Sequence, residues 1–322
     1  LAEEFEIAAS ARLNYVDFML CTVAYLCLML KDLDLPVLGY FGHPLLFMVP
    51  DDQDVREKYW ERFAAMASKS SVEFAVSDPF LQMQFEYQLG KPTLPIIRTH
   101  ALYTGTTHFP TRAAEVLVLD RPHEAILMCA IQRLMGGTPI DWPLADGRLT
   151  EASSSEYPFR FVTRAMTDRK FGTFAQFRAV VLWPYDMDLI TFYEFYGMNM
   201  PIFMPSQLSK YLFHQDHQSY NYRWGERDDP GDYSIWATEE WSPFQELSPG
   251  AAHRIVGFSD YFRFPAVQYF DSMPHLLLQL PTLDFFEVVQ AMARFNRDSM
   301  AESARAWRLL LRRATGFEAE FF

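Results

Sequence analysis

The chain has 322 residues, of which 50% are hydrophobic and 16% aromatic, and this apolar content is enough for one large or two medium cores. Its formal net charge is −13, and the sequence shows no Lys/Arg cluster suited to neutralising a phosphate backbone. Composition therefore predicts a soluble globular protein and argues against nucleic acid and anionic membranes as partners.

The cysteines and one apolar run bear on compartment and membrane. Cys21, Cys27 and Cys129 stand in apolar runs without paired or metal-type spacing, which predicts buried, reduced thiols. Together with the absence of Asn-x-Ser/Thr, this favours the cytoplasm, although the compartment stays open. The run Val16–Leu30 is shorter than the roughly 20 residues of a membrane helix, so no span is expected in this chain.

Strands and helices alternate through the first third of the chain. Apolar runs and helix-start residues predict strands at Tyr15–Leu20, Val37–Tyr40, Val72–Val76 and Pro95–Arg98, and helices at Ala24–Leu30, Val55–Ala67 and Phe80–Leu89. This alternation favours right-handed crossovers and a parallel sheet with helices on both faces. Residues 1–112 are therefore expected to form a Rossmann-like domain that lacks its opening strands.

The same alternation starts again near Glu115. It predicts strands at Val116–Leu119, Phe159–Val162, Ala179–Trp183, Pro201–Met204 and Val267–Phe270, and helices at His123–Leu134, Phe171–Phe177, Asp186 or Asp188 to Met198, and Leu283–Arg313. We expect a second Rossmann-like domain over residues 113–282, with an ordered insertion or lid at about 207–258. The C-terminal helix then occupies residues 283–322, and Thr104–Ala113 is the expected linker. The fold class is α/β.

The segment from Phe177 to Ser206 carries a spaced set of polar residues. Asp186 is followed by seven residues and then Glu194, with Asn199 in a helix-cap position and Pro201 seven residues after Glu194. Ligands of such sheets sit outside the carboxyl ends of the strands, where helix starts offer backbone N–H groups. A carboxylate there can accept hydrogen bonds from two ribose hydroxyls.

This pattern resembles the E-x7-E segment of retaining GT-B glycosyltransferases. The resemblance implies two Rossmann-like domains that face a cleft, and transfer of a sugar from a nucleoside-diphosphate sugar to an acceptor. It implies that Glu194 binds the donor ribose, that Asp186 lies by the donor sugar, and that Arg121 holds the diphosphate. The likeness is good over residues 115–206 and merely architectural before residue 112.

Three departures from the family pattern affect the phosphate side of the site. The first acid is Asp rather than Glu, Met187-Asp188 replaces a glycine-bearing loop, and Ile126 stands where the family often has Lys. Diphosphate binding would then depend on Arg121 with help from Arg164, Arg169 or Lys170. The other candidates are His43, as acceptor-side base or sugar contact, and, on the donor side, His123, Tyr185 and Ser206.

The sequence leaves other functional hypotheses open. His214 and His217 flank Asp216 without a third metal ligand nearby, and no metal or other cofactor is expected. The sequence has no GxGxxG, P-loop or nucleophile elbow, which argues against dehydrogenases, kinases and hydrolases. The alternatives are a non-catalytic GT-B-like binding module and another two-Rossmann-domain sugar-nucleotide enzyme such as an epimerase. The donor, the acceptor and the stereochemical outcome are not specified.

Overall fold

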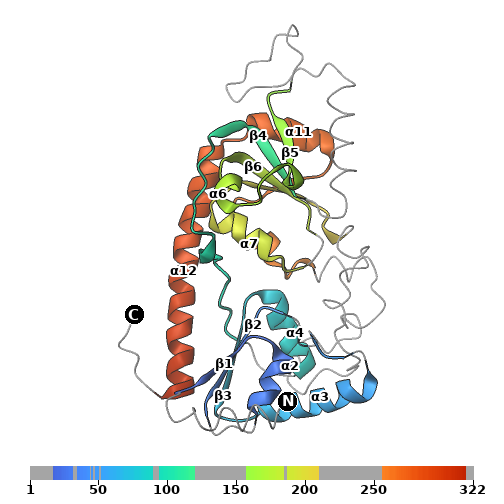
Figure 1. Ribbon diagram of the computed structural model, residues 1–322, viewed down its shortest axis with the longest axis vertical. Helices are drawn as coiled ribbons and strands as arrows, with labels where there is room; N and C mark the ends of the chain where they lie inside the picture. The colour runs from blue at the N-terminus through green and yellow to red at the C-terminus, as the bar shows by residue number, and fades with distance from the viewer. Residues whose placement is uncertain are drawn as a thin grey trace. The chain divides into compact units, whose positions relative to one another are not determined.

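The fold is mixed α/β with two parallel sheets of three and five strands, consistent with the predicted Rossmann-like domains (Figure 1). The computed structural model describes residues 17–31, 35–43, 45, 48–50, 52–89, 94–119, 157–184, 187–209 and 256–316. These residues divide into two compact units. The first unit holds the described residues up to Thr99, 256–260 and Ser299 onward, and the second holds those of 100–209 and 261–298.

The first unit is built on the three-stranded sheet. Its strands are β1 (Met19–Cys21), β2 (Val37–Phe41) and β3 (Val72–Val76), paired in parallel in the order β1-β2-β3. Its helical segments are α2 (Ala24–Cys27), η2 (Leu28–Leu30), α3 (Gln53–Ala67) and α4 (Pro79–Leu89). These match the predicted elements, except that β1 is shorter and that the predicted strand Pro95–Arg98 is reduced to one bridge between Ile96 and Val76.

An aromatic cluster fills the space between this sheet and its helices. Phe41, Phe74 and Phe63 come from β2, β3 and α3, and all are buried. The rings of Phe63 and Phe74 stack with their centroids 5.5 Å apart. Gly39 leaves room for this cluster, since a Cβ on it would lie 2.6 Å from Phe41 and 2.7 Å from Phe74.

The prediction of reduced thiols is wrong for two of the three cysteines. Cys21 ends β1 and Cys27 ends α2, and a disulfide joins them with their Cα atoms 5.6 Å apart. Both side chains are buried, because the tight connection from strand to helix folds the two apolar runs onto each other. Cys129 lies outside the described residues.

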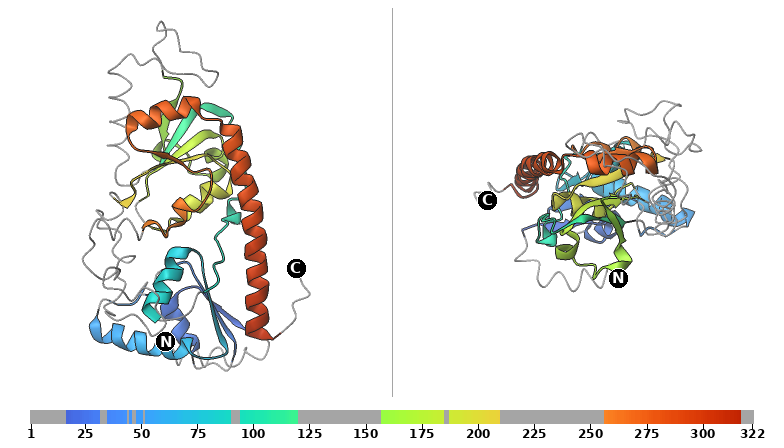
Figure 2. Two further views of the ribbon diagram at one scale, coloured as in Figure 1. Left: turned by 180° about the vertical axis from the view of Figure 1, so that it is seen from behind. Right: turned by 90° about the horizontal axis from the view of Figure 1, so that it is seen from above.

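The second unit is built on the five-stranded sheet. Its strands are β4 (Arg112–Leu119), β5 (Arg160–Thr163), β6 (Phe177–Leu182), β7 (Ile202–Pro205) and β8 (Gln268–Phe270). All pair in parallel in the order β5-β4-β6-β7-β8. Residues 116–119 and 179–182 are buried throughout, as expected for central strands that are covered on both faces. Figure 2 shows these strands from behind, with α11 against the sheet.

The helices of this unit differ from the prediction at their ends. They are η3 (Leu102–Thr104), η4 (Arg164–Met166), α6 (Phe171–Phe174), α7 (Ile190–Gly197), η7 (Asp260–Phe262), α11 (Met273–Thr282) and α12 (Phe285–Thr315). The N-cap of α7 is Leu189, whose N–H donates to the Tyr261 hydroxyl at 3.0 Å, so the predicted cap by Asp188 is wrong. A buried leucine thus stands at the cap position, and no side chain caps the helix. The predicted helix His123–Leu134 lies outside the described residues.

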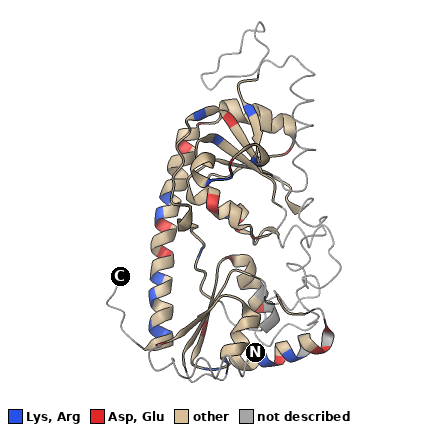
Figure 3. Cartoon of the chain, viewed as in Figure 1, with Lys and Arg blue, Asp and Glu red and all other residues tan. Residues whose placement is uncertain are grey.

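Helix α12 contributes to both units. Phe285 at its start packs in the core of the five-stranded sheet. Leu310 near its end packs on Leu38 and Ile97 of the first unit. Figure 3 shows Arg residues along this helix with acidic residues between them, and in the sheets it shows few charged residues. The apolar stripe and the charged face of α12 match the predicted amphipathic C-terminal helix.

Gly39 gives a test of the packing in the first unit. We expect Gly39→Ala to lower the free energy of unfolding by about 1–3 kcal/mol, because the added methyl group overpacks the aromatic cluster. Gly172→Ala is the matched control, since a Cβ there would meet nothing within 4 Å. Urea denaturation of both variants makes the comparison, and equal losses would contradict this account of Gly39.

Candidate functional site

The strand order of the second unit defines where a ligand is expected. The chain passes from β4 to β5 on one side and then to β6 on the other, so the order reverses between β4 and β6. In doubly wound sheets the crevice at such a reversal, outside the carboxyl ends of the strands, is the usual ligand site. Four predicted site residues in the segments that follow β4 and β6 lie outside the described residues: Arg121, His123, Tyr185 and Asp186.

Glu194 is held by a residue that the sequence analysis did not select. It is half-buried on α7, four residues after the helix start, and its Oε1 accepts a hydrogen bond from the Tyr103 hydroxyl at 2.5 Å. Tyr103 belongs to η3, and its ring lies 6.0 Å from that of Phe171. Within the described part of the chain, no hydrogen bond or ion pair involves the second carboxylate oxygen of Glu194, which can therefore accept from a ligand.

The C-terminal end of α7 is fixed as predicted. Asn199 has φ = 60°, the left-handed conformation expected of a residue just past a helix. Its N–H donates to the carbonyl of Tyr196 at 2.9 Å, and its Oδ1 accepts from Nδ2 of Asn296 at 2.7 Å. Gly197 is needed here, because a Cβ would lie 2.9 Å from the carbonyl oxygen of His100. These contacts hold the helix that carries Glu194.

Ser206 follows β7 at the carboxyl edge of the sheet. Its backbone N–H donates to the carbonyl of Phe270 at 2.9 Å, and its hydroxyl donates to Oδ1 of Asp271 at 2.5 Å. The backbone N–H of Asp271 in turn donates to Nδ1 of His275 at 3.2 Å. Both the amide and the hydroxyl of Ser206 thus donate within the protein, so Ser206 has no donor left for a ligand. Its hydroxyl oxygen can still accept a hydrogen bond from one.

The predicted basic residues are dispersed. Arg164 begins η4 directly after β5 and so stands at the carboxyl edge, while Lys170 is the N-cap of α6, which leads into the amino end of β6. The ammonium of Lys170 is exposed, 3.7 Å from Asp168, and Arg169 is also exposed. His43, in the first unit, is exposed two residues after β2. Glu194 and Ser206 bond to Tyr103 and Asp271, neither of which is a predicted candidate.

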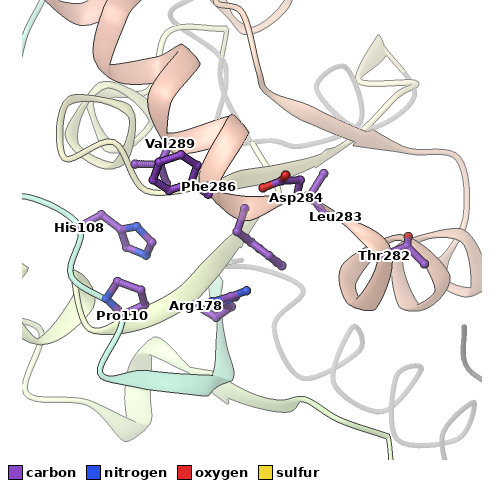
Figure 4. A pocket seen from close by; sticks show the side chains of 9 residues that line it. His108, Pro110, Arg178, Thr282, Leu283, Asp284, Phe286 and Val289 are labelled. Carbon is purple, nitrogen blue, oxygen red and sulfur yellow. The ribbon is translucent and has the colours of Figure 1, made fainter. Parts of the chain in front are cut away.

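A pocket that the sequence analysis missed lies at the opposite edge of the same sheet. It has a volume of about 580 Å³, and its lining includes His108, Arg178, Asp284 and Phe286 (Figure 4). Arg178 is the only charged residue of the otherwise apolar strand β6. A charged residue in an apolar strand can be recognised from the sequence. No local sequence pattern, however, shows that position 178 lies near positions 284 and 286 in the fold.

Over the described ranges, no group of three or more His, Cys, Asp or Glu side chains is arranged to hold a metal ion, and His214 and His217 lie outside them. None of the described helices is, by itself, both long and apolar enough to cross a membrane.

The contact between Tyr103 and Glu194 can be measured through the phenol. Burial, the hydrogen bond and the negative charge of Glu194 all raise the pKa of Tyr103 above its ordinary value. Glu194→Gln removes the negative charge but keeps an acceptor, so the pKa of Tyr103 is expected to fall while staying above that ordinary value. The phenolate absorbance of each protein minus that of its Tyr103→Phe variant isolates this one titration. An unchanged pKa in Glu194→Gln would mean that the two side chains do not interact in solution.

Comparison with known proteins adds no family assignment. No protein-family model matches the chain, and no curated protein matches it significantly. A functional interpretation therefore rests on the five-stranded parallel sheet, the reversal between β4 and β6, and the held carboxylate of Glu194.

Proposed function

We propose that the chain is a glycosyltransferase with a GT-B-like arrangement, and that the second unit binds a nucleoside-diphosphate sugar at the carboxyl edge of its sheet. The observation that carries the proposal is the position of Glu194. It lies on α7, in the connection from β6 to β7 directly beside the reversal between β4 and β6. In sheets of this order, that crevice is the usual ligand site, and in some of them it binds a nucleotide such as FMN.

Glu194 would bind the donor ribose. Tyr103 fixes one carboxylate oxygen at 2.5 Å and so orients the group, which leaves the other oxygen to accept from a ribose hydroxyl. The side chain is carried on α7 about 6 Å from the helix start, at 1.5 Å per residue. A ligand lying alongside α7 from the carboxyl edge would therefore reach it.

The leaving diphosphate needs positive charge. Arg164 stands directly after β5, next to β4 in the sheet, and is a described cation at this edge. Arg121 and His123 are proposed to complete the set from the segment that follows β4. Charge-assisted hydrogen bonds from Arg and N–H groups at helix starts would stabilise the leaving group. Positioning of the acceptor by His43 would supply the remaining part of the rate enhancement.

Nucleotide binding is the primary test. The Tm of the wild-type protein should rise with one of UDP, GDP or ADP, because a ligand at 100 times its Kd stabilises the folded state by about 2.7 kcal/mol. Glu194→Ala should abolish this rise, because it removes the ribose acceptor. Glu287→Ala, an exposed acid in the first turn of α12, is the control and should behave like wild type. No rise with any of the three nucleotides would refute the donor site.

A second experiment separates transfer from binding alone. The non-catalytic alternative is favoured by the amide of Ser206, which bonds to Phe270 rather than facing a ligand. Incubation with labelled sugar nucleotide distinguishes the cases. Transfer or hydrolysis releases the nucleotide, an epimerase changes the sugar without releasing it, and a binding module leaves the donor intact.

A further inference from the structure

A second binding feature lies at the amino edge of the five-stranded sheet. His108 and Pro110 precede β4, and Arg178 is the second residue of β6. Helix α11 starts after the carboxyl end of β8 and runs back, so its last residue, Thr282, and the start of α12 reach the same edge. The pocket of about 580 Å³ between these segments is thus separated from the proposed donor site by the length of the strands.

Arg178 carries a positive charge into this pocket, where Asp284 is the other charged residue of the lining. Its guanidinium lies over the ring of Phe285, with Cζ 4.1 Å from the ring centroid. Its Nε is buried and has no hydrogen-bond acceptor, and within the described part of the chain no carboxylate forms an ion pair with it. A half-buried cation that is held only by a ring face loses hydration without a full replacement.

The neighbouring arginines differ from Arg178. Arg112 forms an ion pair with Glu115 three residues away, and Arg160 lies 3.9 Å from the same carboxylate. The Glu115 carboxylate therefore lies beside two other cations of this edge, and it forms no ion pair with Arg178. Asp284 lines the pocket, but its Oδ1 accepts from the backbone N–H of Glu287 at the start of α12.

The rest of the lining is apolar or neutral. Leu283, Phe286 and Val289 form one wall, and the side chain of Phe286 is 74% exposed, which is high for a large aromatic residue. His108 bonds through Nε2 to the carbonyl of Phe177 at 2.9 Å, and burial lowers its pKa. Figure 4 shows His108, Arg178 and Phe286 around the same space. One cation beside an apolar wall is a common design for ligand pockets of this size.

We propose that this pocket binds a small organic anion, a carboxylate or phosphate on an aromatic or aliphatic body, with Arg178 holding the acidic group and Phe286 contacting the body. The site is independent of the proposed donor site and would be occupied whether or not the protein transfers sugars. The Arg178 guanidinium offers two or more donors to a carboxylate or phosphate, and such charge-assisted pairs are strong.

Ligands with one ring system and different head groups test the proposal on the wild-type protein. Anilinonaphthalenesulfonate serves as the fluorescent probe, and naphthoate, naphthyl phosphate and naphthylmethanol compete for it. Each anion should displace the probe at a concentration about tenfold lower than the alcohol. The stronger of the two anions identifies the preferred head group. Equal competition by the alcohol would overturn the proposal and leave only an apolar pocket.

Variants locate the binding. Arg178→Gln should weaken both anions by about tenfold and leave the alcohol unchanged, while Arg178→Lys should recover part of the loss. Phe286→Ala should weaken all three ligands. Arg160→Gln is the matched control, an exposed arginine of the same edge, and should change nothing. Unchanged anion affinity in a folded Arg178→Gln protein would place the anion elsewhere and refute the role of Arg178.

Discussion

The pairing of β4 with β6 is the constraint on which the second unit depends. Residues Val116–Leu119 lie in register with Ala179–Leu182, and all eight are buried. A pair of strands covered on both faces has no room for polar side chains in its middle. Within these two strands, polar side chains are therefore confined to the ends that lie at the two edges of the sheet. The carboxyl edge has Arg164 and Ser206, and the amino edge has His108 and Arg178.

The core of the first unit is formed differently, by aromatic rings and by the end of α12. Its sheet has only three strands, and rings from β2, β3 and α3 fill the space beneath it. The other side of this sheet is completed by the last turns of α12, where Leu310 and Trp307 pack with Leu38 and Tyr40. A short sheet buries too little by itself, so a helix from the far end of the sequence is needed to close the core. The stability of this unit thus depends on residues after position 299.

Sequence patterns predicted most of the strands and helices, but they did not predict which side chains contact each other. The strands of both sheets were predicted because apolar runs report burial directly, and Asn199 was predicted because few residues tolerate a positive φ. The disulfide between Cys21 and Cys27 was missed because spacing alone does not show which cysteines face each other. Tyr103 and Glu194 are separated by 91 positions, and no local pattern links them.

The net negative charge of the chain makes local cations necessary for the binding of an anionic ligand. With a net charge of −13, the long-range field of the protein repels anions, so an anionic ligand must be held by local cations. At the amino edge, the single carboxylate of Glu115 pairs with both Arg112 and Arg160, while Arg178 stands beside an apolar wall with no ion-pair partner among the described residues. At the carboxyl edge, Arg164 alone is too little for a diphosphate, which carries at least two negative charges. The donor proposal therefore depends on further cations such as Arg121, whereas the anion pocket already contains its cation.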